Sequence, residues 1–420
     1  MTDYRRTFDI EYVKLELECK AGIQDLRRSM VKIVIFEDMY ANGLTCEVIL
    51  KDSEAFQEIL PIVGDEILHL HFRSAKIQDN PFPLIKLDMP IKSIENKIAE
   101  EGSVKQFFTM TFMSKTTAKN LDRRMCRHYN DLESNIASDI FTNVLNVSNF
   151  ETELSKYTRN IVIPNWQPYQ TLDYLAKVAV RPSNYPASNY MWWEDRDKFY
   201  FKSLDKIMEE GAKFKLVNEI TAANKWDDAP NFKKYNVSGI RAVNTFNDMT
   251  NTGNGLWAKE FIGHDIIKRK LTKHKWLYDS EWSASVQIDG KNEKLRTDYP
   301  TNTYVNQDFE PWQEGAEEYN NWHHDDSSKR RLPMMQQFDN YKFICSMPGD
   351  TNIRMGVVCE VDLPSMSHRR KNKLDDVLKG NWLVTRIRHE LNQRTHQMML
   401  EIRKPHLKSF GIQQTIDINS

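Results

Sequence analysis

The sequence lacks the features that mark secreted, membrane-spanning and nucleic-acid-binding proteins. Its five cysteines are spread over 420 residues without a Cys-x-x-Cys pair, which favours reduced thiols over a disulfide framework. The opening MTDYRRTFDIEY has no apolar core of a secretion signal, and no apolar run approaches the length of a membrane-spanning helix. The net charge of -1 excludes an overall basic field for holding nucleic acid. We therefore expect a chain that is made and folded in a cytoplasm.

Signatures of common enzyme classes are also missing. The sequence contains no Gly-x-Ser-x-Gly motif, Walker loop, His-Glu-x-x-His motif or Rossmann glycine pattern. Glu194, Asp195 and Asp197 could form an acid and base pair, but they lie at a predicted hairpin turn, which favours an ordinary polar turn. We expect no enzyme activity and no cofactor. A carboxylate-dependent cell-wall hydrolase is the alternative.

Two histidine clusters are candidates for metal binding. His69 and His71 lie two residues apart on one predicted strand face, where hydrogen-bonded histidines are the commoner outcome. The other cluster has no second ligand pair at a zinc-site spacing, which favours a solvated loop. It consists of four adjacent residues: His323, His324, Asp325 and Asp326. We expect no bound metal, although an ion at this second cluster stays an open alternative.

The chain length allows about two to four domains, and the residue patterns divide it further. Residues 1–115 alternate apolar and polar side chains in short runs with turn signals, among them Ala41-Asn42-Gly43, and this predicts a small antiparallel barrel or sandwich. In the run EYVKLELECK, Val13, Leu15 and Leu17 are expected to share one face. The predicted fold is therefore α+β and dominated by β-strands.

Over residues 116–207 the apolar residues recur at the spacing of helices rather than strands. Apolar residues four apart predict a first helix, which Asn130 and Glu133 could cap, and a second helix starts near Pro168. The stretch YMWWEDRDKFYFKSL then predicts a hairpin. The apolar positions of the two helices are Leu132, Ile136, Ile140, Val144, Leu172, Leu175 and Val178.

The rest of the chain returns to strands around a polar insertion. Residues 208–245 are predicted to be extended, and residues 246–334 are polar and irregular but rich in tryptophan. Within this insertion we expect the basic run 268–275 to be a solvated loop, as we do for 368–373. A contact with an acidic partner surface is the alternative for both runs. Strands resume at 335–405, and a short tail, 406–420, follows.

The hairpin at the end, GNWLVTRIRHELNQRTHQMMLEIRKP, has an unusual outer face. Every second residue from Leu383 to Leu391 can share a core face. The opposite face is then neither plainly core nor plainly solvent. It contains Trp382, Val384, Arg386, Arg388 and Glu390.

The two β regions suggest an internal repeat. The first contains PIVGDEILHLHF, PLIKLDMPI and QFFTMTFMSK, and the second contains NIRMGVVCEVDL, NWLVTRIRHE and THQMMLEIRKP. Both run in the order glycine, strand, loop, strand, turn, strand. Gly64 and Gly356 occupy the corresponding place before the first strand, where a turn or bulge uses the conformational freedom of glycine.

The order of these segments resembles that of the baseplate hub proteins of contractile-tailed, T-even-type phages, and more distantly the N-terminal part of type VI secretion spike proteins. The likeness is carried by four stretches: WQPYQTLDYLAKVAV with YMWWEDRDKFYFKSL, YNVSGIRAVNTFNDMTNTGNGLWAKEFIGHDIIKRK, PGDTNIRMGVVCEVDL and the closing hairpin. The resemblance implies two homologous antiparallel β-barrel tube domains, one at 1–115 and one split into 208–245 and 335–405. A small α+β domain at 116–207 lies between them, and 246–334 is an irregular insertion.

The resemblance also implies a structural protein of the virion tail baseplate that is assembled in the host cytoplasm. Three copies would form a ring that adapts a three-fold central spike, which often bears a lysozyme, to the six-fold tail tube. Baseplate wedge proteins would surround the ring, and DNA would pass through its bore without specific binding or membrane insertion. The hub of a genome-free injection system is an alternative within the same class.

In such a ring, one hairpin face packs inside its barrel and the other meets a neighbour or lines the bore. Trp382 and Val384 are then expected at a subunit interface, and Arg386, Arg388 and Glu390 at its rim or facing the bore. The alternative is that Trp382 packs inside its own barrel.

Overall fold

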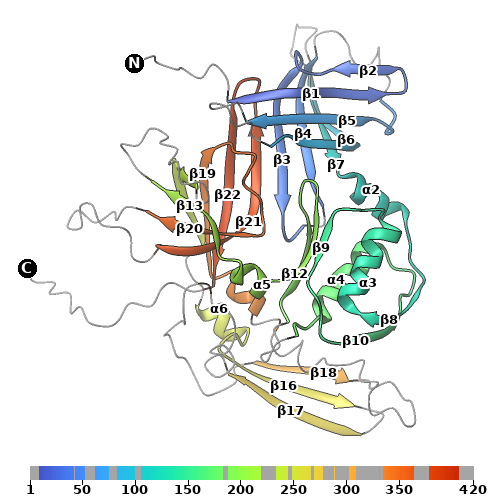
Figure 1. Ribbon diagram of the computed structural model, residues 1–420, viewed down its shortest axis with the longest axis vertical. Coiled ribbons are helices and arrows are strands. Elements are labelled where there is room, and N and C mark those ends of the chain that lie inside the picture. Colours follow the sequence, from blue (N-terminus) through green and yellow to red (C-terminus); the bar gives the residue numbers. More distant parts are fainter. Residues whose placement is uncertain are drawn as a thin grey trace, which may run out of the picture.

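The computed structural model is an α+β protein dominated by strands, as the sequence predicts (Figure 1). It describes the chain except for residues 1–8, 42, 53–61, 75–82, 100–105, 183–187, 219–232, 245–247, 266–268, 278–287, 289–301, 309–330, 332–333, 364–377 and 406–420. Within the described residues, no helix is both long and apolar enough to cross a membrane.

The N-terminal region is a curled sheet of seven strands around one apolar core. Its strands follow the order β3-β4-β7-β6-β5-β1-β2, and consecutive strands β2 and β3 lie at opposite ends of that order. The short segment between them bonds to the strand next to each end: Leu26 N donates to Leu15 O of β1, and Lys51 N of β4 donates to Ser29 O. The sheet therefore closes on itself. The strands are β1 (Ile10–Cys19), β2 (Gly22–Asp25), β3 (Met30–Asp38), β4 (Thr45–Asp52), β5 (Ile67–Ser74), β6 (Ile85–Ala99) and β7 (Gln106–Met113).

A β-bulge corrects the expected face of Val13. Leu15 and Leu17 are completely buried in the first core, but the Val13 side chain is 46% exposed. The pairing of β1 with β5 shifts between Tyr12 and Lys14, so one extra residue reverses the alternation there.

The C-terminal region is a second curled sheet of seven strands. Its order is β15-β19-β22-β21-β20-β13-β14, and the chain again joins the two ends. Val237 N donates to Val217 O and Ser238 N donates to Ser346 O, both at 2.8 Å. The strands are β13 (Ala212–Val217), β14 (Lys233–Asn236), β15 (Gly239–Asn244), β19 (Tyr341–Pro348), β20 (Val357–Asp362), β21 (Gly380–Leu391) and β22 (His396–Lys404).

The two sheets repeat one topology. Replacing β1–β7 in the first strand order by β13, β14, β15, β19, β20, β21 and β22 gives the second order. A bulge also recurs, because Lys92 is the extra residue between two β6–β7 pairs and Thr385 is the extra residue between the matching β21–β22 pairs. The repeat that the sequence suggests is thus present in the strand order and in the register of these strands.

Two details differ from the expectation. The second sheet is not fully antiparallel, because β13 runs parallel to both β20 and β14, whereas β1 is antiparallel to β5 and β2. The register also places Gly64 level with Met355, one residue before Gly356. Both glycines have positive φ, +106° and +70°, but they are neighbours in the repeat rather than equivalents.

The two curled sheets are joined edge to edge. Strand β21 pairs antiparallel with β3, from Arg386 opposite Asp38 to Leu391 opposite Ile33. Figure 1 shows the C-terminal strands β21 and β22 beside β3 at the centre of the molecule. Hydrogen bonding therefore continues from one barrel into the other.

The α+β region 116–207 confirms the predicted helices and hairpin. Its sheets have the orders β10-β8 and β11-β12-β9. The cap of α3 was predicted wrongly: Leu132 precedes the helix without a side-chain cap, because Asn130 lies in strand β8. The elements are α2 (Lys115–Asp122), β8 (His128–Leu132), α3 (Glu133–Asp139), a π-helical turn (Ile140–Val144), β9 (Phe150–Thr152), β10 (Thr158–Val162), α4 (Pro168–Val178), β11 (Tyr190–Glu194), β12 (Phe199–Ser203) and α5 (Leu204–Glu209).

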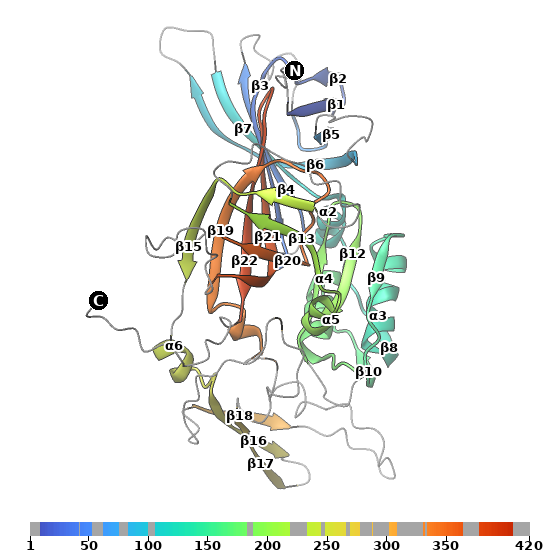
Figure 2. The ribbon, with the colours of Figure 1, turned by 60° about the vertical axis from the view of Figure 1, so that its left-hand side comes forward.

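The insertion contains more regular structure than expected. A short helix, α6 (Asp248–Gly253), precedes a sheet of order β17-β16-β18, formed by β16 (Ala258–Asp265), β17 (Lys270–Leu277) and β18 (Asn302–Asp308). Most of the basic run 268–275 is strand β17 rather than a loop, and the basic run 368–373 lies outside the described residues. Figures 1 and 2 show this sheet at the far end of the molecule from β1.

Candidate functional site at the junction of the domains

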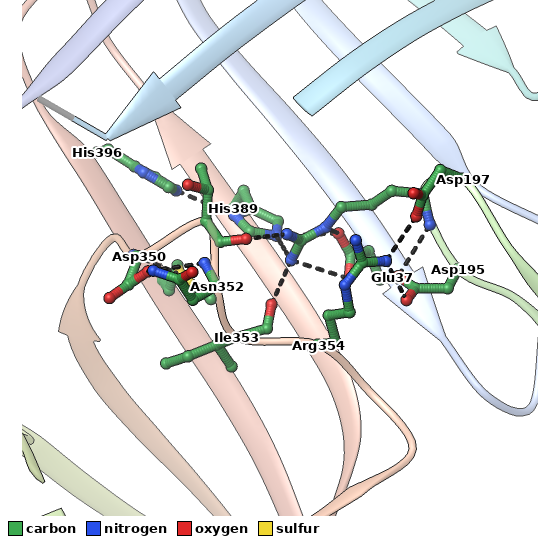
Figure 3. Close-up of polar contacts among 12 residues, drawn as sticks. Glu37, Asp195, Asp197, Asp350, Asn352, Ile353, Arg354, His389 and His396 are labelled. Carbon is green, nitrogen blue, oxygen red and sulfur yellow. Dashed lines mark hydrogen bonds and ion pairs between the residues drawn. The ribbon is translucent and has the colours of Figure 1, made fainter. Parts of the chain in front are cut away.

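A buried ionic cluster links three regions that are distant in sequence. Glu37 belongs to β3, Arg196 to the β11–β12 turn and His389 to β21, and all three side chains are buried. The guanidinium Nε of Arg196 lies 2.5 Å from Glu37 Oε1, and His389 Nε2 lies 3.1 Å from the same oxygen. One carboxylate therefore holds a group from the α+β region and a group from the second barrel (Figure 3).

The same arginine also binds the loop between β19 and β20. Arg196 Nη1 donates to the carbonyl oxygen of Thr351 at 2.8 Å, and Nη2 donates to that of Ile353 at 2.6 Å. Arg354, next in this loop, donates to Asp195 at 2.7 Å and Asp197 at 2.6 Å. The β11–β12 turn is thus fixed to both barrels by charged hydrogen bonds, which are stronger than neutral ones.

The lowered pKa of Glu37 indicates that its carboxylate is ionised at neutral pH. Burial alone would raise that pKa, but the nearby Arg196 and the hydrogen bonds from Arg196 and His389 outweigh it and hold the pKa at about 2. A buried carboxylate is tolerated only when it is paired in this way.

A histidine pair extends the cluster into the second barrel. His389 Nδ1 lies 2.9 Å from His396 Nε2, and the two rings stack. Burial lowers the pKa of His396 well below the usual value, so this ring is neutral. Gly349 is required beside it, because a Cβ at that position would lie 2.0 Å from the His396 ring.

The carboxylates considered for a hydrolase are engaged in contacts within the protein. Glu194 is buried and accepts a 2.6 Å hydrogen bond from Ser114 Oγ, and burial raises its pKa to about 7. Asp195 is buried too, and Arg354 occupies both Asp195 and Asp197. Glu194 therefore has no access to a polysaccharide, and the three carboxylates anchor the turn.

Trp382 and Val384 lie inside the second barrel rather than on an outer face. Trp382 Nε1 donates to Leu378 O at 2.9 Å, and the ring meets Phe343 edge to face. The bulge at Thr385 explains the difference: the extra residue puts Trp382 and Val384 on the same side as Ile387, which strict alternation places opposite. These two side chains thus contact their own barrel.

Arg386, Arg388 and Glu390 are only partly buried and lie along the joint between the barrels. Arg386 Nε lies 2.7 Å from Asp38 Oδ2, and Glu390 lies 2.8 Å from Lys32 Nζ. These ion pairs cross from β21 to β3 within one chain. Whether these three residues also face a bore or a neighbouring subunit stays a prediction.

The strand histidines are hydrogen-bonded, the outcome that the sequence favours. His69 Nδ1 lies 2.7 Å from Asp88 and Nε2 lies 2.9 Å from Glu18, so both ring nitrogens have partners. His71 and Asp88 complete a set whose ligand atoms lie within 4.8 Å of one another, but Lys115 Nζ also lies 3.3 Å from Asp88. The cluster at 323–326 lies outside the described residues.

Comparison with known proteins adds a relative over most of the chain. The chain is 22% identical over 385 residues to the probable baseplate hub protein gp334 of Vibrio phage KVP40, and the match covers 88% of both proteins. The resemblance to phage baseplate hub proteins is confirmed. No protein-family model matches the sequence.

Solved structures share the fold. A tail protein from Neisseria meningitidis aligns with a TM-score of 0.55 at 9% identity, over 94% of this chain and 96% of that one. A 43 kDa tail protein of prophage MuSo2 from Shewanella oneidensis aligns with a TM-score of 0.54 at 12% identity, over 94% of this chain and 98% of that one. The architecture of barrels around an α+β region is therefore an arrangement that phage tail proteins also adopt.

The sequence analysis did not find the ionic cluster. Glu37 lies in the region 1–115 that is predicted to form strands, and Arg196 lies between Asp195 and Asp197 in the predicted hairpin turn. The one signal in the sequence is the charge of Glu37 directly after the apolar run IVIF, on strand β3, which pairs with other strands on both edges. Only the fold brings together residues that are separated by more than 150 positions.

Proposed function

We propose that this chain is the central hub of a contractile phage-tail baseplate, in which three copies form a ring. The observation that carries the proposal is the repeat: one chain contains two curled sheets of the same strand order, fused through β21 and β3. Three such chains present six similar barrels, which suits a junction between a three-fold spike and a six-fold tube. The similarity to a probable baseplate hub protein supports the same role.

The domains proposed for this role are those that the resemblance implies. The tube-like barrels are 1–115 and the split pair 208–245 with 335–405, and the α+β domain is 116–207. Within the insertion 246–334, the sheet of β16, β17 and β18 lies at the far end of the molecule from β1 (Figure 1), and it offers a surface to other baseplate proteins such as the wedges. The ionic cluster around Arg196 fixes the α+β domain to both barrels, so the ring transmits load as one rigid body.

In this role the protein is structural and has no enzymatic activity, and it needs no cofactor. A lysozyme that opens the cell wall would belong to the spike, on another chain. DNA leaves through the bore of the ring, and a net charge of -1 is compatible with passage without tight binding. The protein resides in the virion baseplate after assembly in the host cytoplasm.

The mass of the purified full-length chain in solution tests this proposal. Light scattering is expected to give about three times the 49.5 kDa of one chain, either for the protein alone or after addition of its spike protein. A chain that stays monomeric under both conditions at micromolar concentration would overturn the proposal.

A further inference from the structure

The outer face of the first barrel has a compact group of side chains that can ligate a metal. His69 and His71 belong to β5, and Asp88 lies opposite His69 on β6. Leu68 and Leu70 alternate with the histidines and are completely buried, so the histidines face away from the barrel core. One ligand atom from each of His69, His71 and Asp88 lies within 4.8 Å of the other two. The three side chains are therefore close enough to bind one ion.

Two ring nitrogens already converge on one carboxylate oxygen. Asp88 Oδ1 lies 2.7 Å from His69 Nδ1 and 3.3 Å from His71 Nε2. In a tetrahedral zinc site with bonds of about 2.0–2.2 Å, neighbouring ligand atoms lie about 3.3 Å apart. A zinc ion that takes the place of the shared protons therefore needs only small rotations of partly exposed side chains.

His69 also has the outer hydrogen bond that is typical of a ligating histidine. Its other ring nitrogen, Nε2, lies 2.9 Å from Glu18 Oε2 on β1. Histidines that bind a metal almost always donate their second N–H to a carboxylate, a carbonyl or water, which fixes the tautomer and the ring orientation. Because β5 lies between β1 and β6, His69 presents one nitrogen to each neighbouring strand. The bond to Glu18 leaves Nδ1 as the ligand.

We propose that His69 Nδ1, His71 Nε2 and the Asp88 carboxylate bind one zinc ion on the outer face of the first barrel. Imidazole nitrogens suit zinc, whereas magnesium and calcium prefer oxygen ligands alone. The group is partly exposed, so water completes the tetrahedron in the fourth position. The ion is structural: it links β5 to β6, and it does not depend on the proposed ring.

The sequence alone indicates no metal at these histidines. Two histidines at this spacing on a strand are too few ligands for a zinc site, and the carboxylates come from other strands. The fold supplies what the spacing does not: Asp88 on one side of His69 and Glu18 on the other.

Lys115 is the group that competes with an ion. Its Nζ lies 3.3 Å from Asp88 Oδ2, and its side chain is 53% exposed. It contacts the carboxylate oxygen that does not face the histidines, so Oδ1 stays available to a metal. Its positive charge nevertheless opposes a nearby cation. Removal of this lysine should therefore tighten zinc binding, which damage to the fold would not do.

Calorimetric titration of the full-length chain with zinc tests the proposal. The protein is purified without a histidine tag and contains Cys126→Ser, because Cys126 is exposed and the other four cysteines are buried. We expect one zinc ion per chain. We also expect the unfolding temperature to rise with zinc, since an ion that binds only the folded state stabilises it.

Variants of the site should change the zinc affinity in opposite directions. His69→Ala combined with His71→Ala should abolish saturable binding and the rise in unfolding temperature. Glu18→Gln should raise the dissociation constant by about tenfold, the usual effect of losing an outer hydrogen bond to a ligating histidine. Lys115→Gln should lower the dissociation constant by about two- to fivefold, because a surface charge of like sign is removed.

The other histidine cluster of the sequence gives the matched control. His323→Ala combined with His324→Ala removes the same number of imidazoles and should leave the stoichiometry, the affinity and the zinc-dependent rise in unfolding temperature unchanged. Loss of binding in this control with retention in the His69 and His71 variant would overturn the proposal.

The remaining outcomes are also decisive. A chain that binds no zinc saturably has only a hydrogen-bonded network at these residues, and the proposal fails. If the His69 and His71 variant does not fold, Lys115→Gln decides, because tighter binding supports the site and unchanged or weaker binding refutes it. None of these results depends on whether the chain forms a trimer, so the hub proposal is tested separately.

Discussion

Replacing Arg196 with methionine tests whether the ionic cluster holds the domains together. The variant removes the guanidinium that binds Glu37, Thr351 and Ile353, and it keeps a side chain of similar length. Removing one partner of a buried ion pair costs about 3–5 kcal/mol, because the remaining charge stays buried without compensation. We expect the free energy of unfolding at pH 7 to fall by that amount.

The way in which the stability difference changes with pH distinguishes the loss of this ion pair from a simple loss of packing. The pKa of Glu37 is held at about 2, so its charge stabilises the fold above the ordinary carboxyl pKa, and this contribution is lost as the pH falls towards 2. Without Arg196, burial dominates and the pKa of Glu37 rises. The difference between the two proteins should therefore shrink as the pH is lowered from 7 to 3.

Urea unfolding measures these differences. Circular dichroism and tryptophan fluorescence must give coincident transitions before a free energy is calculated. The double variant Glu37→Met with Arg196→Met should recover at least half of the loss, because no charge remains buried. Lys20→Met is the matched control and should leave the free energy of unfolding nearly unchanged, since Lys20 and its partner Asp65 are both exposed. A loss below about 1 kcal/mol for Arg196→Met, or a fully additive double variant, would refute the reasoning.

Three further variants test other parts of the fold, each by urea unfolding. Gly356→Ala should lower the free energy of unfolding by at least about 2 kcal/mol, because the new Cβ would lie 2.6 Å from Trp193 and φ is +70°. Gly211 has the same φ but open space around it, so Gly211→Ala should cost only about 1 kcal/mol. Glu194→Gln should match the unmodified protein at pH 4.5 but be more stable by up to about 3 kcal/mol at pH 8, because a raised carboxyl pKa means that stability is lost as the pH rises through about 7. Equal pH profiles would contradict this. Trp382→Ala should cost about 3–5 kcal/mol while the folded fraction keeps its oligomeric state, and a selective loss of assembly would show that its barrel-core position is not its main role.

The sequence pattern predicts which face of a strand is buried where the alternation is regular. The prediction fails where one extra residue interrupts the alternation. The alternation in β5 and β7 is regular, so their core faces are those that the pattern indicates. The bulges at Val13 and Thr385 each insert one extra residue into a strand, and the residue types there give no sign of it. Each bulge moves the side chains on one side of it to the other face of the strand. The placement of Trp382 on an outer face was wrong for this reason.

The sequence could not predict the buried ionic cluster, for a different reason. A buried ion pair is recognised by the partner that compensates it, and here the partners come from three regions. The pattern could assign Arg196 to a turn but could not show which surface that turn meets. The short range of hydrogen-bond geometry means that only the assembled fold defines such a site.

The reversed direction of β13 shows which part of the repeat is constrained. Strands β1 and β2 are separated by Lys20 and Ala21 alone, and so short a connection requires an antiparallel pair. Strands β13 and β14 are separated by residues 218–232, which are enough for the crossover that a parallel pair needs. Direction at this position is therefore set locally by the connection. The order and register of β6 and β21 are retained in both barrels, and β21 is the strand whose edge forms the joint between them.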